Sequence, residues 1–378
     1  MQKKKILFLF YRTPFNCVGS NDRRQYLIFS TLSEKFDTKI LAFGEVNQHS
    51  DKQQIIWLKN FKLKKIINFL LKLQSPRITH YYSKEFNESL VENLKTYQPD
   101  LIYVEHLLMM QYVLNIETSA KIIFFNDESN LFVDAKKLRN NLYERIRNFG
   151  LARMDLEACK RADFVFVITK EEGKFLESNG IQNIATIPYG IDTNHFSFNW
   201  QRPESKSILF LGDFSHPPNR VAVKLLCKRI LPSLSDHNVN LKIVGRNIHR
   251  VEKYFSGKID VYKDVEDVRP FYWNSSVFVA PVISGAGLRV KILEAALSGI
   301  PLIITSLANL GIDLISNEEA FICNSIEQII QNLEKYFVAK KDDRFDQMRQ
   351  SARNKIIKNF DERVVKNIII NSFEKISN

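Results

Sequence analysis

The sequence predicts an α/β protein with two parallel-sheet domains, one after the other along the chain. The first observation is the length of 378 residues, which exceeds what one hydrophobic core usually supports. The second is that almost fully apolar segments alternate with segments of helical periodicity, as expected for strands buried on both faces of a parallel sheet. The third is a break at residues 186–207, where Pro188, Gly190 and Pro203 interrupt the alternation before it starts again.

In the first half, apolar runs predict strands, and amphipathic segments predict the helices between them. Ile6–Phe10 is apolar throughout, and residues 22–36 follow it with apolar side chains at helical spacing. The same two patterns recur up to Thr169. The further predicted strands are residues 38–44, 100–105, 121–127 and 163–169, and the further predicted helices are residues 84–97 and 138–162.

The second half repeats the alternation. We expect strands at residues 207–214, 240–245, 277–282 and 299–305, and helices at residues 219–234 and 361–376. The resulting domains are residues 1–188 and 206–360, and residues 189–205 form the linker between them. In sheets of this kind, ligands bind beyond the carboxyl ends of the strands, where loops lead into helices. The polar loops at those ends are therefore the candidate sites.

The composition is that of a globular protein, with 45% hydrophobic and 25% charged residues and no fixed repeat. The four cysteines are far apart and lack the spacing of metal ligands, which favours free thiols in a reducing compartment. The apolar run Ile6–Tyr11 is too short for a signal peptide, and no apolar span approaches the roughly 20 residues of a transmembrane helix. We expect a cytoplasmic protein.

Positive charge is concentrated in one N-terminal segment of a chain whose formal net charge is +12. No acidic residue lies between Asp51 and Glu85, and residues 61–74 combine lysines with apolar side chains near helical spacing. Two interpretations stay open: the basic face of a helix packed on the sheet, or a peripheral contact with an anionic membrane through residues 59–77. No nucleic-acid-binding motif accompanies the charge, so nucleic acid is not an expected partner.

The strongest candidate for a binding site is the loop between the predicted strand 277–282 and a helix that we expect to begin near Leu288. Gly285 and Gly287 in this loop permit positive φ and let a ligand approach the backbone closely. The first amides of a helix have no intrahelical partner and carry the positive end of the macrodipole. A phosphate group suits such a place.

Three charged residues follow the glycines. Arg289 adds a planar fork of donors and Lys291 a point charge, both useful against a diphosphate. Glu294 lies deeper in the same helix, where a carboxylate would repel phosphate but can accept hydrogen bonds from a pair of vicinal hydroxyls, such as those of a ribose. The alternative is an ordinary helix N-terminus with exposed charges, ended by a routine helix stop at Gly299.

Several segments follow one another in the order and spacing of nucleotide-sugar glycosyltransferases: ATIPYGIDTNHF, ILFLGDF, LKIVGRN and GAGLRVKILEAALSGIPLIITS. The chain resembles the retaining GT-B enzymes of glycosyltransferase family 4, also called glycosyl transferases group 1, most strongly from about Phe164 to Gly311. The resemblance implies two Rossmann-like domains that face a central cleft, and a last helix at residues 361–378 that crosses back to the N-terminal domain. It also implies a nucleotide-diphosphate-sugar donor that binds mainly to the C-terminal domain.

The resemblance assigns donor binding to one N-terminal glycine and to the loop and helix described above. Glu294 matches the family glutamate that holds the ribose hydroxyls. The full set of expected donor-binding residues is Gly19, Gly285, Gly287, Leu288, Arg289, Lys291 and Glu294.

The sequence departs from the family pattern at three positions. Ala286 stands where the family has a first glutamate, which contacts the donor sugar. Asp213 and Pro218 stand where the family often has an arginine and a lysine for phosphate. We therefore expect Arg289 and Lys291 to replace those two cations, with two lesser candidates, Arg220 and Arg246.

In the N-terminal half, Gly19 matches a family loop that approaches the donor phosphates and the acceptor, and Arg23 has a position where similar enzymes often carry arginine. A plain turn glycine and a solvated arginine are the alternatives. His106 directly follows a predicted strand, in a region where the family commonly has a histidine near the donor sugar. The alternative for His106 is a capping or core histidine.

A second polar cluster follows the predicted strand 121–127. Asn126, Asp127 and Glu128 end this strand, and Arg23, Asn126 and Asp127 are the candidates for binding the hydroxyl groups of an acceptor. The alternative for Asp127 is a cap on the next helix.

The sequence shows no pair of carboxylates for hydrolysis across a sugar, and no Asp-x-Asp or histidine cluster for a metal. The resemblance implies instead that amides and basic side chains stabilise the leaving nucleoside diphosphate. We therefore expect a metal-independent transferase without a cofactor, with His106, Arg289 and Lys291 as its catalytic residues. In the family, retention is ascribed to same-face attack, in which the leaving phosphate accepts the proton, so no enzyme base is required.

The expected function is transfer of a sugar from the nucleotide donor to a glycan or lipid-linked glycan acceptor. Such a step belongs to the synthesis of a bacterial capsule, lipopolysaccharide or exopolysaccharide at the inner face of the plasma membrane. Two alternatives stay open. One is a nucleotide-sugar 2-epimerase of the same fold, which needs acid and base residues around the sugar. The other is a catalytically silent scaffold that binds nucleotide sugar, which Ala286 suggests.

Overall fold

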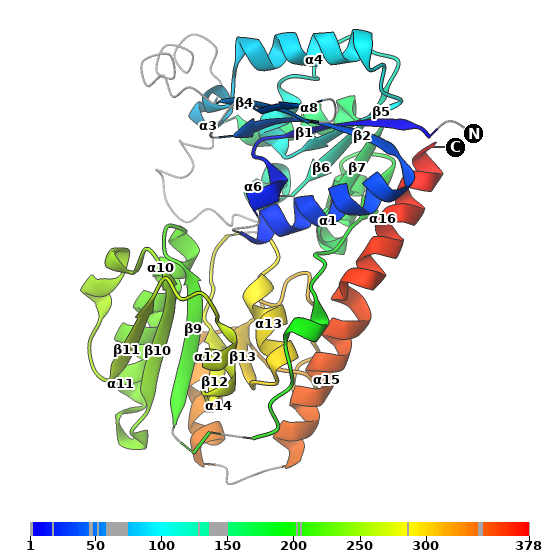
Figure 1. Cartoon of the computed structure of the whole chain (residues 1–378). Coiled ribbons are helices and arrows are strands. Elements are labelled where there is room, and N and C mark those ends of the chain that lie inside the picture. Colours follow the sequence, from blue (N-terminus) through cyan, green and yellow to red (C-terminus); the bar gives the residue numbers. More distant parts are fainter. Residues whose placement is uncertain are drawn as a thin grey trace. The chain divides into compact units, whose positions relative to one another are not determined.

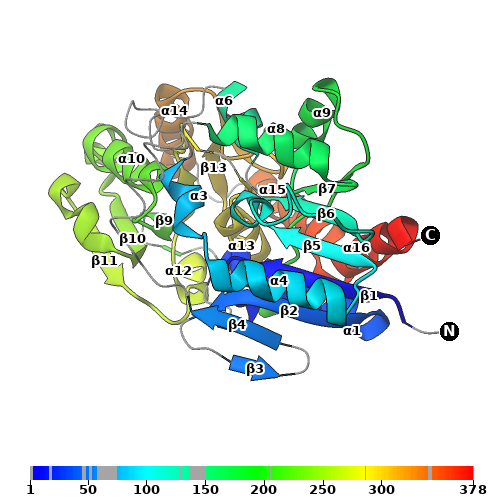
Figure 2. The same ribbon diagram turned by 90° about the horizontal axis from the view of Figure 1, so that it is seen from above.

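The computed structural model describes residues 3–16, 19–44, 48–50, 53–57, 75–127, 129–135, 150–201, 203–204, 206–285, 287–338 and 343–377. The chain divides into two compact units, Met1–Gly190 with Arg363–Asn378, and Ile191–Glu362. Each unit has one sheet of mainly parallel strands with helices packed on it (Figures 1 and 2). The predicted α/β class with two parallel sheets is confirmed.

The sheet of the first unit has eight strands within the described residues, in the order β3-β4-β2-β1-β5-β6-β7-β8. Every neighbouring pair is parallel except β3 and β4, which are antiparallel. Its strands are β1 (Lys5–Phe10), β2 (Asp37–Gly44), β3 (Gln48–Ser50), β4 (Gln53–Trp57), β5 (Leu101–Glu105), β6 (Lys121–Asn126), β7 (Phe164–Val167) and β8 (Ile184–Thr186).

The central strands are apolar because both faces of the sheet are covered. All five residues of β5 are buried, and in β1 and β6 only the first residue is not. Figure 1 shows α4 on one face of the sheet and α1 with α16 on the other. Strands β1, β5 and β6 run parallel, so their carboxyl ends meet at one edge. The residues that follow these strands, including His106 and Asp127, are thereby brought together.

Two of the longer helices of the first unit begin at polar caps. Ser83 accepts a hydrogen bond from the N–H of Phe86 at the start of α4, and Thr169 forms a capping box with Glu172 at the start of α9. The helices are α1 (Ser20–Lys35), α3 (Pro76–His80), α4 (Lys84–Thr96), α5 (Leu107–Met110), α6 (Asn130–Ala135), α8 (Leu151–Arg161), α9 (Lys170–Ser178) and α16 (Glu362–Ser377).

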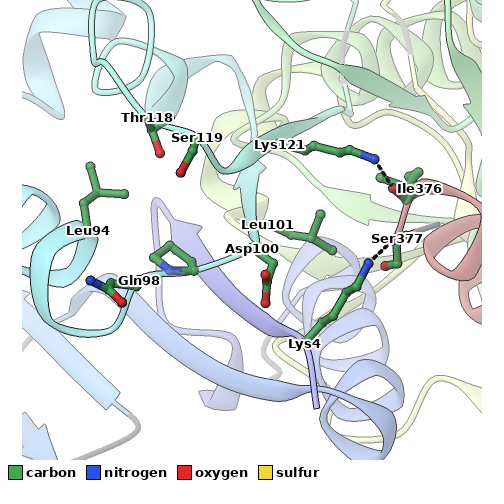
Figure 3. A pocket seen from close by; sticks show the side chains of 11 residues that line it. Lys4, Leu94, Gln98, Asp100, Leu101, Thr118, Ser119, Lys121, Ile376 and Ser377 are labelled. Atoms are coloured by element: carbon green, nitrogen blue, oxygen red, sulfur yellow. Dashed lines mark hydrogen bonds between the residues drawn. The ribbon is translucent and has the colours of Figure 1, made fainter. Parts of the chain in front are cut away.

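Helix α16 packs in the first unit, although it follows the second unit along the chain. The ring of Phe373 lies 5.5 Å from that of Phe166, and the ammonium of Lys121 donates to the carbonyl of Ile376 at 2.7 Å. Lys4 donates to the carbonyl of Ser377 in the same way. Lysines near the last carbonyls of a helix offset its macrodipole. Figure 3 shows the two lysine contacts beside a cavity of about 610 Å³ at the amino ends of β1, β5 and β6.

The sheet of the second unit has six parallel strands among the described residues, in the order β11-β10-β9-β12-β13-β14. Its strands are β9 (Ser207–Asp213), β10 (Asn240–Arg246), β11 (Ile259–Lys263), β12 (Val277–Ala280), β13 (Leu302–Thr305) and β14 (Phe321–Cys323). Its α-helices are α10 (Pro217–Leu225), α11 (Leu231–Ser233), α12 (Arg269–Trp273), α13 (Val290–Ser298), α14 (Ile326–Val338) and α15 (Asp343–Phe360).

Three segments differ from their sequence-based expectation. The helix expected at residues 138–162 is described only as α8, which starts after Gly150 at φ 77°, and residues 136–149 lie outside the described residues. The helix expected at residues 219–234 contains a π-helical segment, Leu226–Ile230. Part of the expected linker packs into the second unit, since Phe196 is buried and Ile191 bridges to Asp361.

The basic segment proposed for membrane contact, residues 59–77, falls mostly outside the described residues, which resume at Ser75. In the described parts of the chain, no helix is both long and apolar enough to cross a membrane.

A close backbone contact sets the spacing of β9 and β10 at their carboxyl ends. Gly245 of β10 pairs with Gly212 of β9 and has φ 149°. A Cβ atom on Gly245 would lie only 1.8 Å from the carbonyl oxygen of Gly212. Glycine is therefore required at position 245 if the two strands are to keep their register.

We predict that Gly245→Ala strongly destabilises the protein, by more than about 4 kcal/mol, because the clash is with backbone and cannot be relieved by a side-chain rotation. The matched control is Gly180→Ala in the first unit, where φ is 81° but no atom lies within 4 Å of the added Cβ. That control should lose only about 1–2 kcal/mol. Denaturant unfolding measures both, and equal losses would contradict the argument.

Candidate active site

The glycine loop of the second unit has the backbone that its sequence predicts. Gly285 has φ 85° and Gly287 has φ 84°. A Cβ on Gly285 would lie 2.8 Å from Cγ of Pro218, whereas a Cβ on Gly287 would meet no atom within 4 Å among the described residues, apart from its chain neighbours. The loop is therefore packed on one side and open at Gly287. Ala286 lies outside the described residues.

Helix α13 begins at Val290, two residues later than the start expected near Leu288. Leu288 precedes the helix, and Arg289 is its N-cap residue, with φ −92° and ψ 84°. The helix ends at Gly299, which has φ 77° and forms the expected stop.

The guanidinium of Arg289 folds back onto its own loop. It donates to the carbonyl of Gly285 at 2.8 Å and also to the carbonyl of Gly287. Arg289 is buried, and the loop carbonyls next to it require donors. The structure thus gives Arg289 a role in shaping the loop, which the sequence analysis did not predict.

Lys291 is held at the carboxyl end of β9. Its ammonium donates to the carbonyl of Leu211 at 2.8 Å and to Oδ1 of Asn219 at 2.8 Å, and it lies 4.4 Å from the ring centre of Phe210. Burial, and secondarily the charge of Arg289, lower the pKa of Lys291 from 10.5 to about 7.

Gly212 makes room for this arrangement. A Cβ at position 212 would lie 2.9 Å from the Asn219 amide and 3.2 Å from the ammonium of Lys291. The sequence analysis did not identify Asn219, because it comes from α10 and meets Lys291 only in the folded protein. An ammonium has three N–H groups, so the two bonds to Leu211 and Asn219 use two of them.

Glu294 is oriented by a tyrosine from a different helix. The hydroxyl of Tyr272 in α12 donates to Oε2 of Glu294 at 2.9 Å. Tyr272 is fully buried, and burial together with the nearby carboxylate raises its pKa far above the ordinary value. Tyr272 therefore stays protonated and fixes one oxygen of Glu294. The sequence analysis missed this contact for the same reason that it missed Asn219.

Three further residues were considered in connection with phosphate: Asp213, which stands where similar enzymes often have an arginine, and the lesser candidates Arg220 and Arg246. Asp213 accepts hydrogen bonds from the N–H of Ser215 at 2.8 Å and from the amide of Asn247 at 2.9 Å, so it caps a turn. Arg220 donates to the carbonyls of Phe214 and Ser215, at 3.0 and 2.6 Å. Arg246 is exposed at the end of β10.

In the first unit, a buried ionic cluster lies at the carboxyl ends of β5 and β6. Nη2 of Arg24 is 2.5 Å from Oε1 of Glu105 and 3.2 Å from Oδ2 of Asp127. Nε2 of His106 is 3.7 Å from Oδ1 of Asp127. Two predicted site residues, His106 and Asp127, are thus brought together. Arg24 and Glu105 join them, although the sequence analysis singled out neither.

The other N-terminal candidates lie apart from this cluster or face inward. Arg23 is exposed in the first turn of α1, and Gly19 is the N-cap residue of that helix. The buried amide of Asn126 donates to Asp155 at 2.7 Å, so it supports α8. Glu128 lies outside the described residues.

Metal ligation and thiol chemistry have few candidates here. In the described ranges, no three His, Cys, Asp or Glu side chains are grouped as a metal site requires. Cys159, Cys227 and Cys323 are buried free thiols. The absence of a metal and of a cofactor from the reaction stays a prediction.

Comparison with known proteins shows what the second unit is similar to. Residues 205–337 match the family described as Glycosyl transferases group 1. The chain is also 24% identical over 213 residues to an uncharacterized 44.6 kDa protein in the cps region of Klebsiella pneumoniae. That match covers 53% of this chain and 52% of the relative, so it spans about half the length of each.

Solved structures share the fold over the whole chain. Sucrose-phosphate synthase from Thermosynechococcus elongatus is similar with a TM-score of 0.75 and 14% identity, covering 99% of both chains. Anabaena Alr3699/HepE in complex with UDP and glucose is similar with a TM-score of 0.69 and 10% identity, covering 98% of this chain and 100% of that one. The chain has the GT-B fold, and with the match at residues 205–337 the comparisons support a glycosyltransferase.

The lowered pKa of Lys291 predicts a pH-dependent stability. The unfolded chain keeps a proton on this lysine up to about pH 10.5, whereas the folded chain releases it above about pH 7. The unfolded state therefore binds more protons in this window, and folding stability rises with pH. We expect wild type to gain stability relative to Lys291→Met from pH 7 upward.

Denaturant unfolding at several pH values between 6 and 9 measures this difference. Lys224→Met, on the exposed side of α10, provides the baseline for loss of a surface lysine. If the free energy of unfolding of wild type minus that of Lys291→Met stays flat or falls as the pH rises, the burial of the ammonium is contradicted.

Proposed function

We propose that the protein is a glycosyltransferase that moves a sugar from a nucleoside-diphosphate-sugar to a glycan or lipid-linked glycan acceptor. The observation that carries the proposal is the match of residues 205–337 to group 1 glycosyl transferases, since the loop before α13 lies inside this range. The solved structure of Alr3699/HepE with UDP and glucose supports a nucleotide-sugar donor. The relative in a cps region supports a place in cell-surface polysaccharide synthesis.

The donor diphosphate is proposed to bind at the start of α13. Here the open side of Gly287 leaves room for a ligand, and the first amides of the helix carry partial positive charge. Lys291 would supply the third N–H of its ammonium, and binding of an anion would favour the charged form of this lysine. Gly285, Leu288 and Arg289 would shape the backbone around the phosphates.

The same groups would act in catalysis. As the bond between sugar and diphosphate breaks, negative charge grows on the leaving phosphate, and preorganised amides and Lys291 would stabilise it. This scheme needs neither a metal nor an enzyme base, and it suits a retaining course in which the leaving phosphate accepts the proton. Gly19 and His106 of the first unit complete the donor-contacting set in this proposal, with Arg23 and Asp127 assigned to the acceptor.

The proposed location is the cytoplasm, with a peripheral contact with anionic lipid at the inner face of the plasma membrane. The composition of residues 59–77 supports the membrane part of this proposal.

The test uses the purified full chain. A thermal-shift screen against nucleoside diphosphates and their sugars should find a donor that raises the unfolding temperature, because a bound ligand stabilises the folded state. The stabilising donor is then incubated with lipid-linked and free glycan acceptors, and NMR of the product reports transfer and the anomeric configuration. Conversion of the donor to its 2-epimer without acceptor would assign an epimerase instead. Binding of a donor without transfer to any acceptor would instead indicate a catalytically silent scaffold that binds nucleotide sugar.

We predict that Glu294→Ala raises KM for the donor by about tenfold to a hundredfold, as expected for hydrogen bonds between a carboxylate and hydroxyl groups. Tyr272→Phe should raise it about twofold to tenfold, because it keeps Glu294 and removes the hydroxyl that orients Oε2 and also lies 3.2 Å from the carbonyl oxygen of Lys291. Tyr262→Phe on the edge strand β11 is the matched control. A donor analogue that lacks the ribose hydroxyls should bind wild type and Glu294→Ala equally well. If Glu294→Ala still distinguishes the two donors, the ribose contact lies elsewhere.

A further inference from the structure

His106 has a backbone conformation that is normally reserved for glycine. Its φ is 73° and its ψ is 146°, at the junction of β5 and α5. For a residue with a side chain, such a conformation costs about 1–3 kcal/mol and persists only where the surroundings enforce it. Strain of this kind is concentrated at functional sites, so the groups that enforce it here are of interest.

The first of these groups fixes the tautomer of the imidazole. Nδ1 of His106 accepts a hydrogen bond from the backbone N–H of Leu108 at 3.1 Å. An acceptor nitrogen carries no proton, so the proton of the neutral ring is on Nε2. The lone pair of Nδ1 is used by this bond, and Nε2 has none to offer. In this state His106 can donate a hydrogen bond but cannot act as a base.

The second group is Asp127, which faces the proton-bearing nitrogen. Its Oδ1 is 3.7 Å from Nε2, which is within the range of charge attraction but longer than a hydrogen bond. The ring of His106 also packs against the ring of Tyr11, with 5.1 Å between their centres. The imidazole is thus confined between a ring and a carboxylate.

Asp127 is in turn held by Arg24. The guanidinium is 3.2 Å from Oδ2 of Asp127 and lies 4.6 Å from the ring centre of Phe125. Arg24 and Asp127 are 2% and 8% exposed, so the pair is shielded from water. A planar guanidinium presents donors at fixed angles, which a lysine cannot reproduce. Arg24 therefore determines where the carboxylate of Asp127 points.

Glu105 completes the cluster on the other side of Arg24. Its Oε1 is 2.5 Å from Arg24, and its Oε2 accepts a hydrogen bond from the hydroxyl of Tyr103 at 2.5 Å. Burial raises the pKa of Glu105 to about 7, whereas at Asp127 burial is outweighed, in part by the charge and the hydrogen bond of Arg24, and the pKa is lowered. Asp127 is thus the carboxylate that stays ionised, next to Nε2.

We propose that Arg24 and Glu105 are positioning residues, which act through Asp127 to hold His106 as a hydrogen-bond donor through Nε2. This inference rests on the proposed transferase function for its substrate, an oxygen of the sugar or phosphate of the donor. It goes beyond that function because it assigns roles to Arg24, Glu105 and the N–H of Leu108. It also excludes His106 as the base that would deprotonate an acceptor.

The first experiment reads the tautomer without any substrate. Nitrogen-15 NMR of the histidine rings, with His106→Gln to assign the signal, should show Nε2 protonated and Nδ1 unprotonated near pH 8. Arg24→Lys and Asp127→Asn should shift the nitrogen-15 resonances of the His106 ring. Arg153→Lys, which changes an exposed arginine of α8, should leave them in place. A ring with its proton on Nδ1, or one unaffected by both cluster variants, would overturn the proposal.

The second experiment measures transfer. His106→Gln keeps an N–H donor and should retain more of kcat than His106→Ala, with His249→Gln on the surface as control. Arg24→Lys should lower kcat about tenfold to a hundredfold with little change in KM, because it misplaces a reacting group and not the bulk of the donor. Equal losses for Gln and Ala at position 106 would overturn the donor role.

A milder variant controls for loss of folding in Arg24→Lys. Where Arg24→Lys proves unstable, Tyr103→Phe removes only the hydroxyl that holds Glu105, and a smaller decrease in kcat is expected from it. If wild type turns over no nucleotide sugar, the proposed function fails, and the NMR signal of His106 alone decides whether the positioning network exists.

Discussion

Both candidate sites depend on one constraint: a charged side chain buried at the carboxyl edge of a parallel sheet must find its hydrogen-bond partners inside the protein. In the second unit, Lys291 meets this requirement with the carbonyl of Leu211 and the amide oxygen of Asn219. In the first unit, Arg24 meets it with Glu105 and Asp127. The partners come from strands and helices far apart in sequence, so each site exists only when its unit is folded.

The carboxyl edges of the two sheets differ in the charged and polar groups that surround the buried side chain. The second unit gathers positive charge and amide donors around a loop that stays open at Gly287, which suits an anion. The first unit balances its charges internally and exposes little of them, which suits the orientation of a single side chain, His106. In the proposed transfer reaction, the arrangement in the second unit would receive the negative charge of the leaving diphosphate, and that in the first unit would orient a hydrogen-bond donor.

Sequence patterns predict the central strands and the glycine loop well, because long apolar runs and paired glycines are compatible with few local structures. They miss β3, β8 and β14, which are short, β4, which lies near the start of the acid-free basic segment, and β11, which is only partly buried. They also fail to separate Arg23 from Arg24, since neighbouring arginines differ only in the face of α1 on which they lie. The bonds from the guanidinium of Arg289 to the carbonyls of its own loop were not predicted either. Contacts such as these depend on tertiary packing, which no local pattern encodes.

The anchoring of α16 brings the two ends of the chain together, since Lys4 contacts the carbonyl of Ser377 (Figure 1). Neighbouring ends are what a circular permutant requires. A short flexible peptide between them, with new termini opened at the exposed Gly180, would leave every strand pairing of both sheets in place.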